Sequence, residues 1–321
     1  MPQIAATLTL SDRLGTWKAR WGIGRMNYMV PPGLYAIGTP TPDDPVLVTA
    51  NYKMSYDIIR SVLTGRNAWL LVLETYGINV WCAAGKGTFG TEELVRRIRT
   101  SNLAKAVSHR RLILPILGAP GVAAYEVTRQ TGFSIRYAAI RAGDIPKYLD
   151  NSMMTTAEMR EQTFTLRERA VLIPVELVMA LKPTAIVTAA LFALGAMLYG
   201  IQIGLITVFA YLGAVISGIA LAPLLLPWLP GRSFAFKGAL IGLAWIAAFY
   251  LLTPGQWWNG PVAVATFVAL PAVSAFYTLN FTGCTPFTSR SGVKKEMRVA
   301  IPAMGIALIA SVFILAIGKL L

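Results

Sequence analysis

The stretch PVLVTANYKMSYDIIRSVLTGRNAWLLVLE, residues 45–74, decides the fold class of this chain. It begins with a short apolar run, PVLVTA at 45–50, which is typical of a buried strand. Ser55 is expected to cap a helix that runs to Gly65, and a second apolar run follows at 68–74. A strand, a helix and a strand joined by short connections predict a β-α-β unit with a parallel strand pair.

The same alternation continues downstream. A helix is expected to open at Thr91, where acidic residues occupy the first turn. Strands are predicted at 111–117 and 134–140, with a helix at 122–130 between them. Repeated β-α units predict an α/β domain with a Rossmann-like, mostly parallel sheet that is covered on both faces. Ligands in such folds bind beyond the carboxyl ends of the strands, so the loops there are the place to look for chemistry.

The C-terminal part has the composition of a membrane protein. Residues 183–321 hold only 7 of the 29 Lys and Arg residues and 1 of the 15 Asp and Glu residues. We expect an α/β domain at 1–168, followed by an all-α transmembrane domain of about five helices at 169–321. Each of its apolar runs is about long enough to cross ~30 Å of hydrocarbon, and they lie at 183–200, 203–229, 238–253, 261–281 and 299–318.

The basic residues predict how the chain is oriented in the membrane. They cluster in the loops at 232–237 and 290–298, whereas the alternate loops carry no charge. By the positive-inside rule we expect a multi-pass protein of the cell (inner) membrane, with the N-terminal domain in the cytoplasm and the C-terminus outside. The apolar segment 170–182 contains Glu176 and Lys182, so an interfacial entry helix is expected there, with Pro174 near its start.

Several familiar functions are disfavoured. The net charge of +14 does not indicate nucleic acid, because no nucleic-acid motif is present and basic residues beside membrane segments explain it. The run GKGTFG at 85–90 has dinucleotide-motif spacing but neither follows a strand directly nor precedes the required acid. One histidine, His109, gives little support to a zinc site or a Ser-His-Asp triad. Cys82 and Cys284 imply no disulfide framework.

The most distinctive stretch is NVWCAAGKGTFGTEEL, residues 79–94, in the long loop after the second predicted strand. Asn79, Cys82 and Lys86 stand at i, i+3 and i+7, a spacing that shares one helical face. The small residues at 83–85 would let a flat ligand approach the backbone, and a thiolate beside them could bind a metal. The alternative is a short helix that packs a small buried cysteine.

This stretch strongly resembles the cap-helix motif of the corrinoid proteins of microbial mercury methylation, the HgcA family. The likeness covers nearly the whole chain and includes PGLYAIGTP (32–40), PVLVTANYKMSYD (45–57), LPILGAPGVAAYEV (114–127) and NFTGCTPFTSRSGVKKE (280–296). The N-terminal domain also resembles the corrinoid domain of the large subunit of the corrinoid iron–sulfur protein of acetyl-CoA synthesis. That relative is soluble and has no cysteine at the position of Cys82.

The resemblance implies a base-off cobalamin beneath the cap helix, with Cys82 as the axial cobalt ligand and the catalytic residue. The implied activity is a methyltransferase reaction that moves methyl from methylcobalt to Hg(II) and gives methylmercury. Cys284 would either relay mercury or simply pack in its loop. The implied cofactor-binding residues are Thr49, Asn51, Thr75, Asn79, Val80, Trp81, Cys82, Ala83, Ala84, Gly85, Lys86, Gly118, Ala119, Pro120 and Gly121.

The resemblance also implies partners. Two cysteines are too few for an iron–sulfur cluster, so electrons are expected from a ferredoxin-like protein with two [4Fe-4S] clusters. The methyl source would be a methylated folate-type donor or its methyltransferase, and membrane lipid would surround the helices. Two alternatives stay open: a membrane-bound corrinoid methyltransferase with another thiol or metalloid acceptor, and a transporter with a cytosolic regulatory domain. The charge-free spans count against the transporter.

Overall fold

The stretch at 45–74 folds as the β-α-β unit that its pattern predicts. β3 spans Val46–Ala50, α2 spans Lys53–Val62 and β4 spans Ala68–Leu73. β3 and β4 pair in parallel, and all five residues of β3 are buried. The predicted cap at Ser55 is wrong by three residues, because Tyr52 is the N-cap and only Asn51 and Tyr52 connect the strand to the helix.

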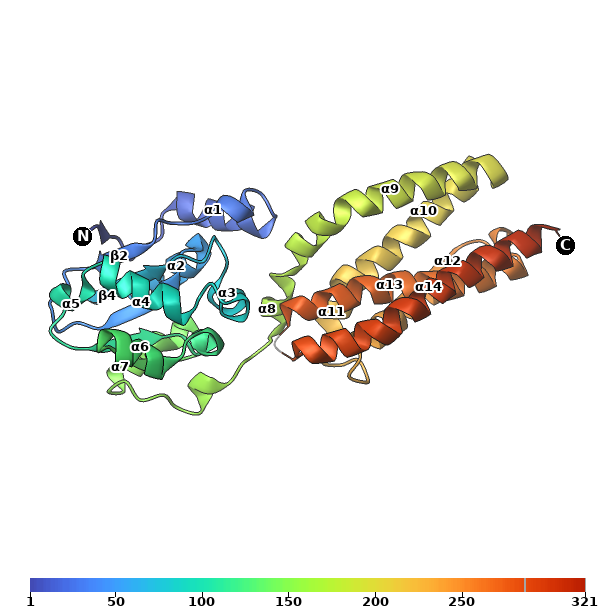
Figure 1. Ribbon diagram of the computed structural model, residues 1–321. Coiled ribbons are helices and arrows are strands. Elements are labelled where there is room, and N and C mark those ends of the chain that lie inside the picture. The colour runs from blue at the N-terminus through green and yellow to red at the C-terminus, as the bar shows by residue number, and fades with distance from the viewer. Residues whose placement is uncertain (286, 321) are drawn as a thin grey trace. The chain divides into compact units, whose positions relative to one another are not determined.

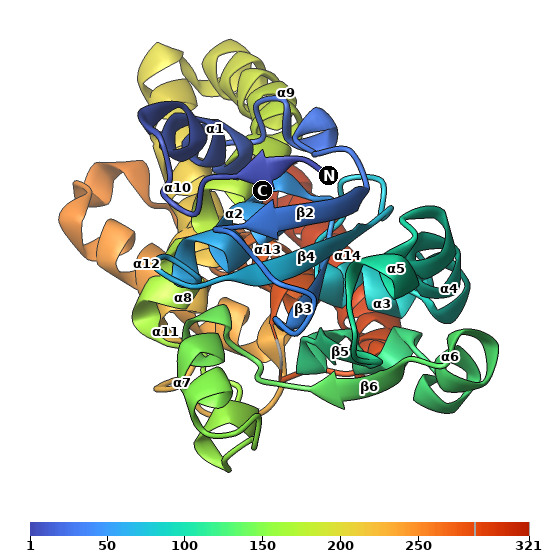
Figure 2. The same ribbon diagram turned by 90° about the vertical axis from the view of Figure 1, so that its left-hand side faces the viewer.

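Four further strands extend this pair into a six-stranded sheet of order β1-β2-β4-β3-β5-β6, which Figure 2 shows face on. They are β1 (Gln3–Ile4), β2 (Gly33–Ile37), β5 (Arg111–Leu114) and β6 (Ser134–Tyr137). β2 runs antiparallel to β4, whereas the other neighbouring pairs are parallel. The predicted mostly parallel sheet is confirmed, whereas the antiparallel strand β2 was not predicted.

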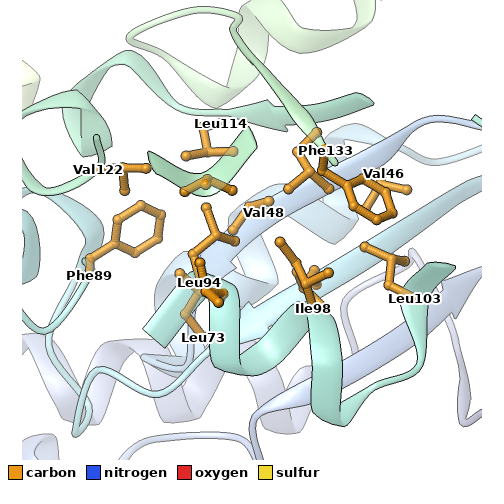
Figure 3. Packing of buried hydrophobic residues seen from close by; sticks show 14 of the residues in the cluster. Val46, Val48, Leu73, Phe89, Leu94, Ile98, Leu103, Leu114, Val122 and Phe133 are labelled. Atoms are coloured by element: carbon orange, nitrogen blue, oxygen red, sulfur yellow. The ribbon is translucent and has the colours of Figure 1, made fainter. Parts of the chain in front are cut away.

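Helices cover both faces of the sheet. One face packs against α4 (Thr91–Thr100), α5 (Leu103–Ala106) and α6 (Ala124–Thr131). Figure 3 shows this core, in which Leu94 and Ile98 of α4 meet Val48 and Leu73 of the sheet. The other face packs against α2 and α7 (Ile145–Asp150). The predicted helices at 91 and 122–130 are confirmed, the second with its start moved to Ala124.

The structure describes residues 1–285 and 287–320 in a computed structural model, and these divide into two units, Met1–Thr163 and Phe164–Leu321 (Figure 1). The expected boundary at residue 168 falls inside α8 (Leu166–Ala170), the first helix of the second unit. The first unit holds the whole sheet and the helices on both of its faces.

The second unit is helical. Among the described residues, five helical segments are long and apolar enough to cross a membrane: Leu166–Tyr199, Ile201–Leu225, Phe234–Leu252, Gly260–Gly283 and Ser291–Gly318. They are built from α9 (Ile173–Tyr199), α10 (Ile201–Ile216), α11 (Ala222–Leu225), α12 (Phe234–Leu252), α13 (Gly260–Asn280) and α14 (Arg290–Leu320), with α8 at the start. A five-residue π-helical turn, Ser217–Leu221, joins α10 to α11.

The interfacial entry helix expected at 170–182 is the first part of α9, which begins at Ile173 with Pro174 in its first turn and continues into the first apolar run. Its interfacial position stays a prediction. Pro183 lies inside the 27-residue helix without ending it. A helix of this length is about 40 Å long, which exceeds the ~30 Å of hydrocarbon in a bilayer. Its first turns, with Glu176 and Lys182, can therefore lie outside the apolar layer without a break in the helix.

Small residues bring the helices of the second unit close together. A Cβ added to Gly242 of α12 would lie 2.6 Å from the Cβ of Ser274 in α13. Likewise, a Cβ on Gly195 of α9 would lie 2.9 Å from the Cα of Gly204 in α10. Close approach of this kind is the usual means of helix association in a membrane. Lipid chains are as apolar as the helices, so burying apolar surface between two helices contributes no hydrophobic free energy there.

Helix α1 (Leu10–Arg20) is attached to the first unit through charges rather than through apolar packing. The Asp12 carboxylate lies 2.6 Å from Lys53 Nζ and 2.7 Å from Arg60 Nη2. Asp57 completes the network by pairing with the same two cations of α2. Burial alone would raise the pKa of Asp12, but hydrogen bonds from Lys53, Thr9 and Arg60 outweigh it and hold the pKa well below its usual range.

We predict that Asp12→Asn loosens α1, because Lys53 and Arg60 lose a charged partner in a largely buried place. The expected loss is about 2 kcal/mol of local stability at pH 7. A carboxyl group with a lowered pKa stabilises the folded state above its unfolded pKa of about 4, and this contribution is lost as the pH falls below that value. The difference between variant and wild type should therefore shrink below about pH 4.

Hydrogen exchange of the α1 amides at pH 7 and at acidic pH, corrected for intrinsic rates, measures this effect. Asp150→Asn is the matched control, since its partner Arg66 forms an exposed pair whose loss should leave α1 unchanged. Equal exchange of α1 in Asp12→Asn and wild type at pH 7 would contradict the assignment.

Candidate functional site

The order of the parallel strands places the candidate site. Strands β4-β3-β5-β6 follow the flavodoxin-like doubly wound order. In this order the chain adds strands first on one side of the starting strand and then on the other, and the switch lies between the strands that correspond to β3 and β5. The loops that leave those two strands depart toward opposite faces, and in folds of this order ligands bind beyond the carboxyl ends of these strands. In this chain the two loops are Asn51–Tyr52 and Pro115–Gly121.

The side chain of Asn51, at the end of β3, organises the loop after β4. Its Oδ1 accepts hydrogen bonds from the backbone N–H groups of Thr75 and Gly77, each at 3.1 Å. Its Nδ2 donates to Glu74 Oε1 at 2.6 Å. Asn51 is only 1% exposed. A buried amide that satisfies both of its polar ends fixes its neighbours firmly, because the alternative is an unpaired polar group in the core.

A second carboxylate extends this network to α4. Glu93 Oε1 accepts from the backbone N–H of Glu74 at 2.8 Å and pairs with Arg97 Nη2 at 2.8 Å. Burial would raise the pKa of Glu93, but the hydrogen bonds from the Glu74 backbone, Arg97 and Arg96 lower it below its usual range. Glu93 therefore stays charged at neutral pH and ties the end of β4 to the first turn of α4.

The segment 79–94 forms the predicted short helix, followed by α4. Helix α3 spans Val80–Lys86, and Asn79 is its N-cap, with Oδ1 accepting from the Cys82 N–H at 2.9 Å. Ala83 and Ala84 are buried against the domain, whereas Cys82, Gly85 and Lys86 are exposed. The alternative of a short helix that buries its cysteine is therefore wrong. Asn79 lies before the helix and shares with Cys82 a capping bond rather than a helical face.

The loop after β5 packs directly against α3. It forms a 3₁₀ helix, η2 (Ile116–Gly121), and two of its glycines lie where no side chain fits. A Cβ on Gly121 would lie 2.1 Å from the carbonyl oxygen of Phe89 and 3.0 Å from Ala84 Cα. A Cβ on Gly118 would lie 2.6 Å from the Phe89 ring. These contacts bring the 118–121 loop and the cysteine helix together at one edge of the sheet.

The predicted site residues thus lie in two layers. Thr49, Asn51 and Thr75 are buried at 1%, 1% and 0% exposure, and they support the loops from within. Asn79, Val80, Trp81, Ala119 and Gly121 are half-buried, and Pro120 is exposed beside them. Direct contact of any of these residues with a cofactor stays a prediction. The side chain of Cys284, for which a relay role and a packing role were open, lies outside the described residues.

Three residues that shape this edge were not predicted as site residues: Tyr76, Glu74 and Glu93. Tyr76 adopts φ of 55° and is 65% exposed in the loop that leads from β4 to α3. A bulky residue in the left-handed region is strained, and such strain clusters at functional sites. The only signal for Tyr76 was its place between a strand end and Gly77. Glu93 was recognised for its place in the first turn of a helix, but its bond to the β4 end is a tertiary contact.

Other features of the described surface do not coincide with this edge. Two hollows, of about 260 and 360 Å³, lie beside Pro32 and Arg97 and beside Arg96 and Gln130. Neither contains a predicted site residue. Within residues 1–285 and 287–320, no cluster of three or more His, Cys, Asp or Glu residues could hold a metal ion. At this edge the thiol of Cys82 is exposed.

Comparison with known proteins matches the first unit. Residues 24–148 match the family model described as CO dehydrogenase/acetyl-CoA synthase delta subunit. The acetyl-CoA decarbonylase/synthase complex subunit gamma of Archaeoglobus fulgidus is 35% identical over 130 residues, which is 40% of this chain and 27% of that protein. The same subunit of Methanopyrus kandleri is 30% identical over 131 residues, 40% of this chain and 28% of the relative.

The chain thus spans little more than a quarter of the length of these curated relatives. The family-model match ends at residue 148, before the helical unit Phe164–Leu321 begins. The predicted likeness of the first domain to a subunit of acetyl-CoA synthesis is confirmed, while the likeness to the HgcA family stays a prediction. The first unit is similar to subunits of the CO dehydrogenase/acetyl-CoA synthase system, and the helical unit has no counterpart in the matched residues.

Proposed function

We propose that this chain is a corrinoid-dependent methyltransferase of the membrane, that it uses Cys82 as the axial ligand of cobalt, and that it methylates Hg(II). The observation that carries the proposal is the exposed thiol of Cys82 on a short helix at the carboxyl edge of the sheet. The similarity of residues 24–148 to acetyl-CoA synthase subunits supports a corrinoid at this edge. The resemblance of residues 79–94 to the HgcA cap helix supports the mercury acceptor.

The residues around Cys82 fit such a group. An axial ligand must present its sulfur to open space, and Cys82 is exposed while the neighbouring alanines face the core. A flat macrocycle needs a smooth surface, and Gly85 has no atom within 4 Å of the place where its Cβ would be. The bond from the Cys82 N–H to Asn79 fixes the first turn of the helix and hence the origin of the thiol side chain.

A bound corrinoid would supply a cobalt-carried methyl group that can leave toward a soft electrophile such as a Hg(II) thiolate complex. The Cys82 thiolate would hold the metal and donate electron density to it. Asn51 and Glu93 would keep the loop after β4 in place. The loop at 118–121, with the backbone of 79–86, would hold the edges of the ring. Trp81, half-buried on the helix, would pack beside it.

The reaction requires electrons from outside this chain. Hg(II) takes the methyl group together with its bonding electron pair, so the cofactor must be reduced before it accepts the next methyl cation equivalent. The chain has two cysteines, whereas an iron–sulfur cluster usually needs four thiolates. We propose a ferredoxin-like partner with two [4Fe-4S] clusters as the electron donor. A methylated folate-type donor, or the methyltransferase that uses it, would supply the methyl group.

The substitution Cys82→Thr tests the axial role. We expect the variant to keep its corrinoid, because the loops and the rest of α3 still hold the ring. A hydroxyl is a weak ligand, so the visible spectrum should shift and methylmercury formation should fall by orders of magnitude. If Cys82 were only structural, this nearly isosteric change would cost about 1 kcal/mol of stability and leave the chemistry intact.

Cys284→Thr is the matched control, because it makes the same substitution at the other cysteine. It should retain both the spectrum and the activity if Cys284 has no mercury-relay role. Corrinoid content and methylmercury are measured on each protein, together with products from other thiol and metalloid acceptors. Near-normal methylation by corrinoid-loaded Cys82→Thr would overturn the axial role, and preferred transfer to another acceptor would overturn the mercury assignment.

The membrane assignment is tested by topology. We propose that the five long apolar helices cross the cell membrane, with the first unit in the cytoplasm and the C-terminus outside. The basic loop at 232–237 and the first turns of α14 would then lie on the cytoplasmic side. A reporter fused after Leu321 should be active outside, and one fused before Met1 should be active inside. Both ends on one side would contradict an odd number of spans.

A further inference from the structure

Helix α1 presents its apolar side chains to the outside of the first unit. Leu10, Leu14, Trp17 and Trp21 recur at i, i+4, i+7 and i+11, which aligns them in one stripe. They are 73%, 53%, 67% and 38% exposed. In a helix that packs on a soluble domain, a stripe of this spacing normally faces the core. Here the stripe faces away from it.

The opposite face of α1 is the one that packs on the domain, and it is small and polar. Asp12 pairs with Lys53 and Arg60, and its backbone carbonyl accepts a 3.2 Å hydrogen bond from the Tyr28 hydroxyl. Gly15 lies so close to Tyr28 that an added Cβ would be 2.5 Å from the phenol oxygen. The attachment therefore fixes which side of α1 points outward.

Basic residues border the apolar stripe on both sides. At 3.6 residues per turn, Arg13 and Arg20 lie along one border and Lys18 along the other. Asp12, the only acid of the helix, is turned inward and neutralised by its two cationic partners. The outward surface of α1 and its C-cap residue Trp21 thus combines two tryptophans and two leucines with the exposed positive charges of Arg13 and Lys18.

We infer that α1 lies in the interface of the membrane and binds anionic lipid. Its stripe would sink into the boundary between headgroups and acyl chains, where tryptophan rings are favoured, and the flanking cations would pair with lipid phosphates. The cytoplasmic leaflet is rich in anionic lipid, so it matches the charge of this surface. The helical unit, anchored in the same bilayer, would hold the first unit within reach. The inference rests on that membrane assignment and not on the corrinoid chemistry.

Fluorescence quenching of the full-length protein in lipid nanodiscs tests this inference. The signal of Trp17 is obtained as the difference between wild type and Trp17→Phe, a conservative change at an exposed position that cancels the other seven of the eight tryptophans. Discs contain phosphatidylcholine with phosphatidylglycerol, and the acyl chains carry bromine near the headgroup end. We expect these lipids to quench the Trp17 signal and acrylamide in the water to quench it little.

Trp69 provides the matched control within the same unit. It is half-buried in β4 with its Nε1 donating to the Thr41 carbonyl at 2.9 Å, so its signal, obtained with Trp69→Phe, should be unaffected by brominated lipid. Incorporation of each variant into discs reports the membrane assignment of the helical unit independently of α1.

A charge reversal tests the lipid class. Arg13→Glu with Lys18→Glu should abolish lipid quenching of Trp17, as should discs of phosphatidylcholine alone. Lys105→Glu with Arg136→Glu makes the same change at exposed positions elsewhere on the unit and should leave the quenching intact.

Three outcomes would overturn the inference. If acrylamide but not brominated lipid quenches the Trp17 signal, α1 lies in water. Trp17 shielded from both quenchers would mean that the stripe packs against protein, either a partner or the helical unit. Quenching unchanged by charge reversal or by loss of phosphatidylglycerol would remove the role of anionic lipid.

Discussion

The buried side chain of Asn51 is the contact on which the candidate site depends. It stands at the end of β3, next to the point where the strand order reverses, and it bonds the Glu74 carboxylate and the N–H groups of Thr75 and Gly77. These three residues lie in the turn that leads into α3. Asn51 therefore determines where α3 begins, with Asn79 as its N-cap and Cys82 in its first turn. Because the amide is 1% exposed, loss of its bonds would leave backbone donors unpaired inside the domain. A cysteine carried on a loop of this length would otherwise have no fixed direction.

A second constraint comes from the glycines. Gly118 and Gly121 allow η2 to touch Phe89 and Ala84, so the cysteine helix is held from the β5 side as well as from the β4 side. This double support explains why residues with no reactive atoms accompany the cysteine in the motif at 79–94. Ala83 and Ala84 are buried in the contact, and Gly87, with φ of 83°, ends the helix after two turns. Ala83 and Ala84 pack against the domain, whereas the thiol of Cys82 is exposed.

The sequence was informative where a single local pattern decides the structure. Apart from Thr49 and the terminal Glu74, the runs at 45–50 and 68–74 are apolar, as expected of strands covered on both faces, and both formed strands of the parallel sheet. β2 was missed because Gly33–Ile37 pairs antiparallel with a strand more than thirty residues away. The support of the site was also invisible, since the bonds of Asn51 to Gly77 and of Glu93 to Glu74 join residues whose positions only the tertiary fold brings together. For α9, charges at Glu176 and Lys182 indicated an interfacial entry segment, and a helix longer than the hydrocarbon layer has room for both.

Helix α1 shows the opposite failure of a pattern rule. Its spacing predicts an amphipathic helix, and the usual reading would turn Leu10, Leu14, Trp17 and Trp21 toward the core. The pairing of Asp12 with Lys53 and Arg60 favours the opposite orientation. Turning Asp12 away would leave these largely buried cations of α2 without one of their carboxylate partners, at a higher cost in free energy than leaving apolar side chains exposed. Leaving a large apolar side chain in water forgoes about 1.5–3 kcal/mol that burial would provide. Four such residues in one stripe therefore amount to several kcal/mol available to whatever surface covers them. The bilayer that the proposed transmembrane helices would occupy could supply that surface without a separate binding partner.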